Sequence, residues 1–156
     1  MKKTNFLSKL VKQGKLELVE SSEIIKSAYL KKSENYLDSA KILLKNNHFE
    51  ESISMAYYSM YYILTALLFK SGIKCENHTG SIIISEYLFG LDMSEISLAK
   101  KERIDKQYYV DFHTTGKDAK KLIKISENFN SKIIDYLSKL NNKDIKEARK
   151  KLLQLV

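Results

Sequence analysis

The chain has 156 residues, of which 44% are hydrophobic, and it carries a formal net charge of +8 at pH 7. This length is enough for one domain with a sizeable core, and the lack of proline together with only five glycines favours long helices over a turn-rich β fold. The apolar runs are short and interrupted by lysine, so we expect no membrane span. The N-terminus has no continuous apolar segment typical of a secretory signal, which predicts a cytoplasmic protein.

Disulfide and metal chemistry have little support in the sequence. Cys75 is the only cysteine, which excludes an intrachain disulfide and a cysteine-based zinc cluster. The three histidines lie far apart and form no i, i+4 pair on a helix, so we expect no metal site and no cofactor. The excess of lysine permits attraction to nucleic acid or to an acidic partner, but its spread along the chain is typical of a solvated surface.

The first half of the chain predicts an antiparallel pair of long helices. Residues 1–20 form a basic extension with a short helix broken at Gly14, and Ser22 is placed to cap a helix over residues 23–46. After a short turn, a second helix covers residues 50–71 and ends at Gly72 in the left-handed conformation. Two helices joined by so few residues must pack antiparallel.

The helix over residues 50–71 is apolar on almost all sides. Its apolar stripe comprises Ile53, Ala56, Tyr57, Met60, Tyr61, Leu64, Leu67 and Leu68, and it is widened by Tyr58, Tyr62, Ile63 and Phe69. A helix of this kind must be covered on most sides. We therefore expect it to be the central helix of a bundle, and we predict a homodimer because one bundle does not cover so wide a stripe.

The second half of the chain continues the helical pattern. The predicted elements are a helix over residues 80–89, a helix over 95–109 capped by Ser94, a loop over 110–116, a helix over 117–140 that begins at Asp118, and a basic tail helix within 141–156. No segment has a convincing strand pattern. The sequence therefore predicts a single all-α domain, an up-and-down bundle of about five helices.

Several segments follow one another in a specific order. Asn-His-Phe-Glu-Glu-Ser at 47–52 leads into Ala-Tyr-Tyr-Ser-Met-Tyr at 56–61, followed by the turn His-Thr-Gly at 78–80. An arginine helix with Gln-Tyr-Tyr-Val-Asp at 107–111 and a helix beginning Lys-Asp-Ala at 117–119 complete the series. Over roughly residues 23–140 this pattern resembles the HEPN family (higher eukaryote and prokaryote nucleotide-binding domain), most closely its small stand-alone archaeal and bacterial group.

The resemblance implies an up-and-down helical bundle that commonly dimerises and is often paired with a small nucleotidyltransferase. It also implies a link to toxin–antitoxin systems, in which many members cleave RNA without metal. Their motif is an arginine followed, after four to six intervening residues, by a histidine, and the pair lies in a cleft at the dimer interface. In such chemistry the arginine stabilises phosphate charge and the histidine transfers a proton.

This chain departs from that motif. Arg103 matches the arginine, but Tyr108, Tyr109 and Val110 stand where the histidine would fall, and His113 comes three residues too late. Because the ordinary pKa of tyrosine is near 10, it is a poor proton shuttle at neutral pH. We therefore expect no strong ribonuclease activity.

The same residues remain candidates for binding. Arg103, Asp105, Gln107, Tyr108, Tyr109 and His78 are the predicted contacts to RNA, a nucleotide or a partner protein. The alternatives are structural: an ion pair of Arg103 with Asp105 or Asp111, and a fixed histidine at position 78. The tyrosines at 57, 58, 61 and 62 are interpreted as core and dimer interface, with a stacking platform for bases as the alternative.

Two functions of different kind follow from these residues. The first is a dimeric binding module that works with a nucleotidyltransferase-type partner, or with a nucleotide or RNA, in a toxin–antitoxin-like system. The second is an RNA-cleaving enzyme with a degenerate site of Arg103 and Tyr108 or Tyr109. An open, electropositive environment around Arg103 favours ligand binding, whereas a closed ion pair favours a structural role.

Overall fold

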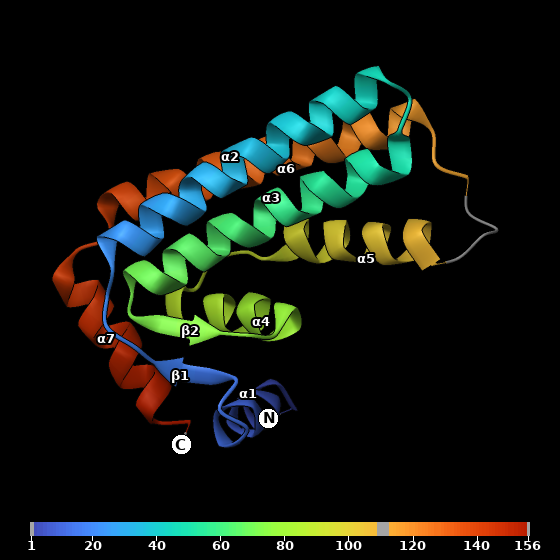
Figure 1. Ribbon diagram of the computed structural model, residues 1–156. Coiled ribbons are helices and arrows are strands. Elements are labelled where there is room, and N and C mark those ends of the chain that lie inside the picture. Colours follow the sequence, from blue (N-terminus) through green and yellow to red (C-terminus); the bar gives the residue numbers. More distant parts are fainter. Residues whose placement is uncertain (1, 109–112, 156) are drawn as a thin grey trace.

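The computed structural model describes residues 2–108 and 113–155 and shows an all-α architecture, as the sequence predicts. In chain order the elements are α1 (Lys2–Lys12), β1 (Leu16–Leu18), α2 (Glu23–Lys45), α3 (Phe49–Lys70), β2 (Ile73–Cys75), α4 (His78–Phe89), α5 (Ser94–Tyr108), α6 (Gly116–Lys139) and α7 (Asn142–Leu153). The three long helices α2, α3 and α6 lie side by side, and α5 runs along α3 on the side away from α2 (Figure 1). This arrangement places α3 at the centre of the bundle.

The ends of the helices follow the capping chemistry of the sequence, with one exception. Ser22 accepts a hydrogen bond from the backbone N–H of Ile25, and Gly72 follows α3 with φ +69°, a conformation that favours glycine. At the start of α6, Thr115 and Asp118 form a reciprocal capping box. The expectation that Ser94 caps α5 is wrong: the carboxylate of Asp92 accepts from the Ser94 N–H at 2.9 Å instead.

Helix α3 carries the main hydrophobic core. Its fully buried side chains include Ile53, Tyr57, Met60, Leu64 and Leu67. Contrary to the sequence expectation, α3 is long and apolar enough to cross a membrane, but 61% of its most apolar window is buried inside the structure. The core helix of a soluble protein has the same properties, so the apolar surface is accounted for by packing against α2, α5 and α6.

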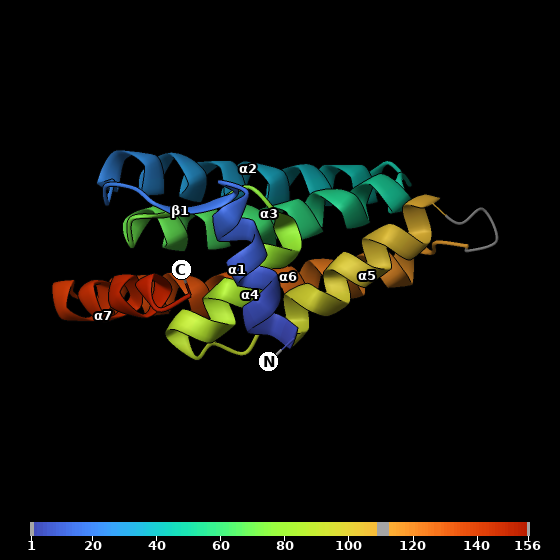
Figure 2. The same ribbon diagram turned by 90° about the horizontal axis from the view of Figure 1, so that it is seen from below.

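A small antiparallel sheet corrects the expectation that the chain has no strands. Leu16 pairs with Cys75 and Leu18 with Ile73, so β1 and β2 link the segment before α2 to the segment after α3. Each strand has three residues, which is too short for a recognisable alternating pattern in sequence. The sheet anchors the N-terminal segment against the bundle, and α1 lies across α4 on the side away from α2 and α3 (Figures 1 and 2).

Both terminal helices pack into a second hydrophobic cluster. It contains Leu7 and Leu10 of α1, Leu16 of β1, and Ala148 and Leu152 of α7, all of them buried. The N-terminal extension and the C-terminal tail are basic on the outside but contribute apolar side chains to the inside. The segments that the sequence analysis treats as an N-terminal extension and a C-terminal tail therefore belong to the packed structure.

Candidate functional site

The predicted residues His78 and Arg103 come together beneath the tyrosines of α3, although 25 positions separate them in the chain. His78 is the first residue of α4, and Asn77 caps this helix by accepting from the Gly80 N–H at 2.7 Å. Gly80 is buried, and a Cβ there would lie 2.5 Å from Cδ1 of Leu10. The His-Thr-Gly turn thus combines a side chain for the site with a glycine that lets α1 pack closely.

The imidazole of His78 is held by two tyrosines. Its Nδ1 lies 2.9 Å from the hydroxyl of Tyr57, and its ring stacks on Tyr61 at 3.8 Å between centroids. Burial, followed by the positive charges of Arg103 and Lys100, lowers the pKa of His78 below its ordinary value. Burial also raises the pKa of Tyr57, so a neutral imidazole next to a protonated phenol is favoured at neutral pH.

Arg103 contacts Tyr57 as well, together with Tyr58. Its Nη1 donates to the hydroxyl of Tyr58 at 2.8 Å, and its guanidinium carbon lies 5.2 Å from the ring centre of Tyr57 and 5.1 Å from that of Tyr58. Within residues 2–108 and 113–155, no carboxylate forms an ion pair with Arg103, and its buried Nε has no hydrogen-bond partner. The alternative ion pair with Asp105 is therefore not formed, and the one with Asp111 falls outside the described residues.

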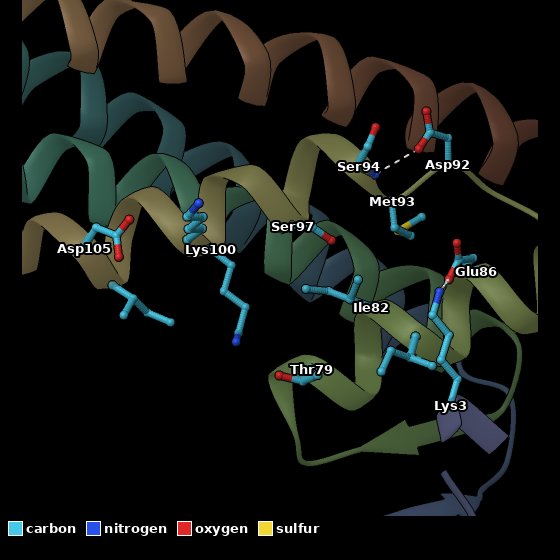
Figure 3. Close-up of a pocket in the computed structure, with 13 residues that line it drawn as sticks. Lys3, Thr79, Ile82, Glu86, Asp92, Met93, Ser94, Ser97, Lys100 and Asp105 are labelled. Carbon is cyan, nitrogen blue, oxygen red and sulfur yellow. Dashed lines mark hydrogen bonds and ion pairs between the residues drawn. The ribbon is translucent and has the colours of Figure 1, made fainter. Parts of the chain in front are cut away.

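A groove of about 500 Å³ runs beside this cluster between α1, α4 and α5. Thr79, Lys100 and Asp105 line the end near the cluster, and the ion pair between Lys3 and Glu86 closes the other end (Figure 3). Lys100 both lines this groove and acts on the pKa of His78, which links the groove to the cluster electrostatically. The lining carries charges of both signs, with the lysines at 3, 100 and 101 balanced by Glu86, Asp92 and Asp105, and Arg103 is not part of it.

The tyrosines of α3 extend from this cluster into an aromatic band with α2. Tyr36 of α2 contacts Tyr58 and Tyr62 edge-on, and Tyr29 stacks on Tyr62 and Phe69. Tyr57 is fully buried, which confirms that part of the band is core, and the remaining rings are half-buried between the two helices. Burial raises the pKa of Tyr62 to about 12, so its phenol stays protonated.

Two of the other predicted residues lie in the last turn of α5. Gln107 and Tyr108 belong to this helix, but their side chains are outside what the structure describes, and Tyr109 lies outside the described residues. His113 is exposed in the segment before α6. In the described part of the chain, no group of three histidine, cysteine or acidic residues is arranged to hold a metal ion.

Sequence reasoning missed three participants of the site: Tyr58 as the partner of Arg103, Lys100 beside His78, and Tyr36 from α2. The spacing of Lys100 and Arg103 by three positions places them on one side of α5 and could have indicated the pair. Contacts from other helices are set by tertiary packing and leave no local signal.

A central aromatic helix with an arginine helix and a His-Thr-Gly turn packed on it defines a helical bundle of the HEPN type. A comparison with family models confirms this class, since the HEPN domain model matches residues 26–136, and the chain belongs to the HEPN domain family.

Two curated relatives share shorter segments with the chain. A UPF0332 protein of Pyrococcus horikoshii is 43% identical over 63 residues, which are 40% of this chain and 42% of that protein. A UPF0332 protein of Thermotoga maritima is 31% identical over 62 residues, 40% of this chain and 47% of the relative. The chain thus spans less than half the length of each of these relatives.

Proposed function

We propose that this chain is a HEPN-type binding module whose surface around Arg103 takes a phosphate group of a nucleotide or of RNA. The observation that carries the proposal is the environment of Arg103: a partly buried guanidinium lies on two tyrosines, and no carboxylate in the described residues neutralises it. A planar guanidinium presents several N–H donors in a geometry that matches phosphate oxygens. With one donor occupied by Tyr58, further donors are left for a ligand.

Two more features support an anionic ligand. Lys100 adds a second positive charge next to Arg103, and the net charge of +8 increases the rate at which an anion meets this surface. The half-buried tyrosines provide aromatic edges against which a base can pack. The groove beside Lys100, at about 500 Å³, has the volume of a small-molecule site.

The module works as a homodimer together with a nucleotidyltransferase-type partner, in a cytoplasmic toxin–antitoxin-like system. This part of the proposal is supported by the chain's membership of the HEPN family, because members of this family are often paired with a small nucleotidyltransferase. The resemblance to the HEPN family implies that α5, which carries Arg103 and the exposed Leu98, lies near the two-fold axis of the dimer.

One observation favours metal-independent RNA cleavage as a second candidate function. His78 supplies the imidazole that α5 lacks, because it reaches the neighbourhood of Arg103 from a different helix. A neutral histidine can accept a proton from a 2′-hydroxyl, and the guanidinium can stabilise phosphate charge. Against this role, Tyr57 occupies Nδ1 and Tyr61 covers one face of the ring.

Fluorescence anisotropy with a labelled single-stranded oligoribonucleotide, with ATP as competitor, tests the proposal. We expect Arg103→Met to weaken binding by about tenfold, since a hydrogen bond to a charged group contributes about 1.5–3 kcal/mol. Lys146→Met is the matched control, because it removes one exposed positive charge on α7 and should change affinity by less than about twofold. Equal losses in both variants would contradict a site at Arg103.

The same samples separate binding from cleavage. RNA incubated with the natural protein in the presence of a chelator should stay intact on a denaturing gel. If the natural protein cleaves RNA and both Arg103→Met and His78→Gln abolish the cleavage, the protein is a ribonuclease and the binding-module proposal is wrong.

A further inference from the structure

The hydrogen bond between Tyr57 and His78 determines which nitrogen of the imidazole carries the hydrogen. Tyr57 is fully buried, and among the described residues its hydroxyl has one partner, Nδ1 of His78 at 2.9 Å. If the phenol accepted this hydrogen bond, its own O–H would be buried without an acceptor, which is costly. The phenol therefore donates and Nδ1 accepts, so the hydrogen of the neutral imidazole is on Nε2.

The imidazole ring is also fixed in its plane. It stacks on Tyr61 with 3.8 Å between the ring centroids and 12° between the ring planes, and it meets Tyr58 edge-on. A half-turn of the ring would put a carbon atom in the place of Nδ1 and leave the buried hydroxyl of Tyr57 unpaired. His78 thus has one orientation and one tautomer.

The second nitrogen of this ring is open to a ligand. His78 is half-buried, and its Nε2 has no hydrogen bond with the described residues, yet it is not one of the enclosed unpaired atoms, in contrast to Nε of Arg103. The ring of His78 and the guanidinium of Arg103 both lie within 6.0 Å of the ring centres of Tyr57 and Tyr58. An anion held by Arg103 therefore has a neutral N–H donor close by.

The surroundings of the ring oppose a charged form. The titratable and charged groups that contact it or act on it are Tyr57, Tyr58 and Tyr61 of α3 and Lys100 and Arg103 of α5. This set contains two cations and no carboxylate, so nothing in it stabilises an imidazolium. A proton on Nδ1 would in addition turn away the hydroxyl hydrogen of Tyr57, which has no second acceptor among the described residues.

We propose that His78 binds a phosphate oxygen of the ligand as a neutral hydrogen-bond donor through Nε2, and that Tyr57 is the positioning residue that holds Nδ1. This inference rests on the proposed function and makes it more specific, because the ligand meets His78 with an acceptor oxygen and its binding takes up no proton. It also opposes the ribonuclease alternative, since neither nitrogen of the imidazole is left to accept a proton from a 2′-hydroxyl.

Nitrogen-15 nuclear magnetic resonance of the full chain without ligand determines the tautomer. The chain has three histidines, and His78→Gln assigns the signals of this one. We expect the hydrogen on Nε2 at neutral pH, and a mixture of tautomers in Tyr57→Phe, which keeps the ring but loses the donor to Nδ1. Tyr61→Phe is the matched control, because it keeps the stacked ring and should leave the tautomer unchanged. A hydrogen on Nδ1 in the natural protein, or the same tautomer in Tyr57→Phe, would overturn the proposal.

Calorimetric titration with a short oligoribonucleotide without terminal phosphates tests the role of His78 in binding. The phosphodiesters of this probe keep their charge at neutral pH, so titrations in two buffers of different ionisation enthalpy report on the protein, and we expect no proton uptake. His78→Phe keeps a ring on Tyr61 but lacks the donor, and it should bind the probe about tenfold more weakly. His48→Phe, at an exposed turn, should change the affinity by less than about twofold.

The outcomes separate this inference from the proposed function. If the natural protein binds the probe with proton uptake that His78→Phe abolishes, or if His78→Phe binds as tightly as the natural protein, the role of His78 is wrong and the proposed function stands. If the natural protein does not bind the probe, the proposed binding of RNA is wrong, and the role of His78 as a phosphate ligand is wrong with it.

Discussion

Arg103 and His78 both contact Tyr57 and Tyr58. The two side chains are close enough for the charge of Arg103 to lower the pKa of His78. Tyr57 bonds to the imidazole and carries the guanidinium over its ring, while Tyr58 accepts from Arg103 and meets the imidazole edge-on. The tyrosines replace the carboxylate that usually partners a buried arginine. As a result, the guanidinium is held in place, and no carboxylate in the described residues neutralises its charge.

The lowered pKa of His78 predicts how stability depends on pH. Because the folded pKa lies below the unfolded value of 6.5, the unfolded state binds more protons and the folded state loses stability as pH falls below about 6.5. Urea unfolding between pH 8 and pH 5 should show this loss, and His78→Phe should reduce it. His48→Gln, at an exposed turn, should keep the dependence of the natural protein. An unchanged pH profile in His78→Phe would contradict the assignment.

At the scale of elements, Arg149 connects α7 to the end of α3 by hydrogen bonds, in addition to the packing of Ala148 and Leu152 in the second hydrophobic cluster. Nη1 of Arg149 donates to the carbonyls of Val19 and Gly72, each at 2.7 Å. Gly72 ends α3, so a positive charge lies at the C-terminal end of the central helix, where the helix dipole favours it. Arg149 therefore joins the segment after β1, the end of α3 and the C-terminal helix.

Removal of this connection should destabilise the whole fold. Arg149→Ala leaves two carbonyls without their donor, and we expect the free energy of unfolding to fall by about 2–3 kcal/mol. Lys150→Ala, at the exposed neighbouring position, should change it by less than about 0.5 kcal/mol. Urea unfolding followed by circular dichroism measures both. Equal stability of the two variants would mean that the two hydrogen bonds of Arg149 contribute little to the fold.

The elements also show which parts of the structure are predictable from sequence. Helices α2, α3 and α6 follow directly from apolar periodicity and capping residues, because both signals are local. The two three-residue strands and the packing of α1 and α7 do not, since they depend on partners far away in the chain. The same reason explains the site: Arg103 was found from its motif, but its contacts with Tyr58 and its proximity to His78 arise from the packing of α4 and α5 on α3.

For the whole molecule, the net charge of +8 predicts binding to RNA that depends strongly on salt. A plot of log affinity against log salt concentration should be linear, with a slope set by the number of phosphates contacted. Arg103→Met should reduce the slope by about 0.7, the contribution of one phosphate contact on a single strand. A slope that does not change would show that Arg103 contacts no phosphate.

The homodimer is a prediction at the same scale. Helix α3 is covered by α2, α5 and α6 of its own chain, so the interface must use other surfaces, and we expect α5 at the two-fold axis. Light scattering coupled to size exclusion should give twice the mass of the 18.1 kDa chain at micromolar concentration. Leu98→Glu on α5 should shift the mass toward the monomer, whereas Leu153→Glu on α7 should not. A monomer mass for the natural protein would contradict the dimer.

The binding of phosphate at Arg103 is tested most directly by nuclear magnetic resonance. The chain has two arginines, Arg103 and Arg149, so a ¹⁵N spectrum contains two Nε–H signals, which Arg103→Lys assigns. On titration with a short single-stranded oligoribonucleotide, we expect the Arg103 signal to shift and saturate while the Arg149 signal, held between two carbonyls, stays in place. An Arg103 signal that does not move while the RNA binds would contradict this account.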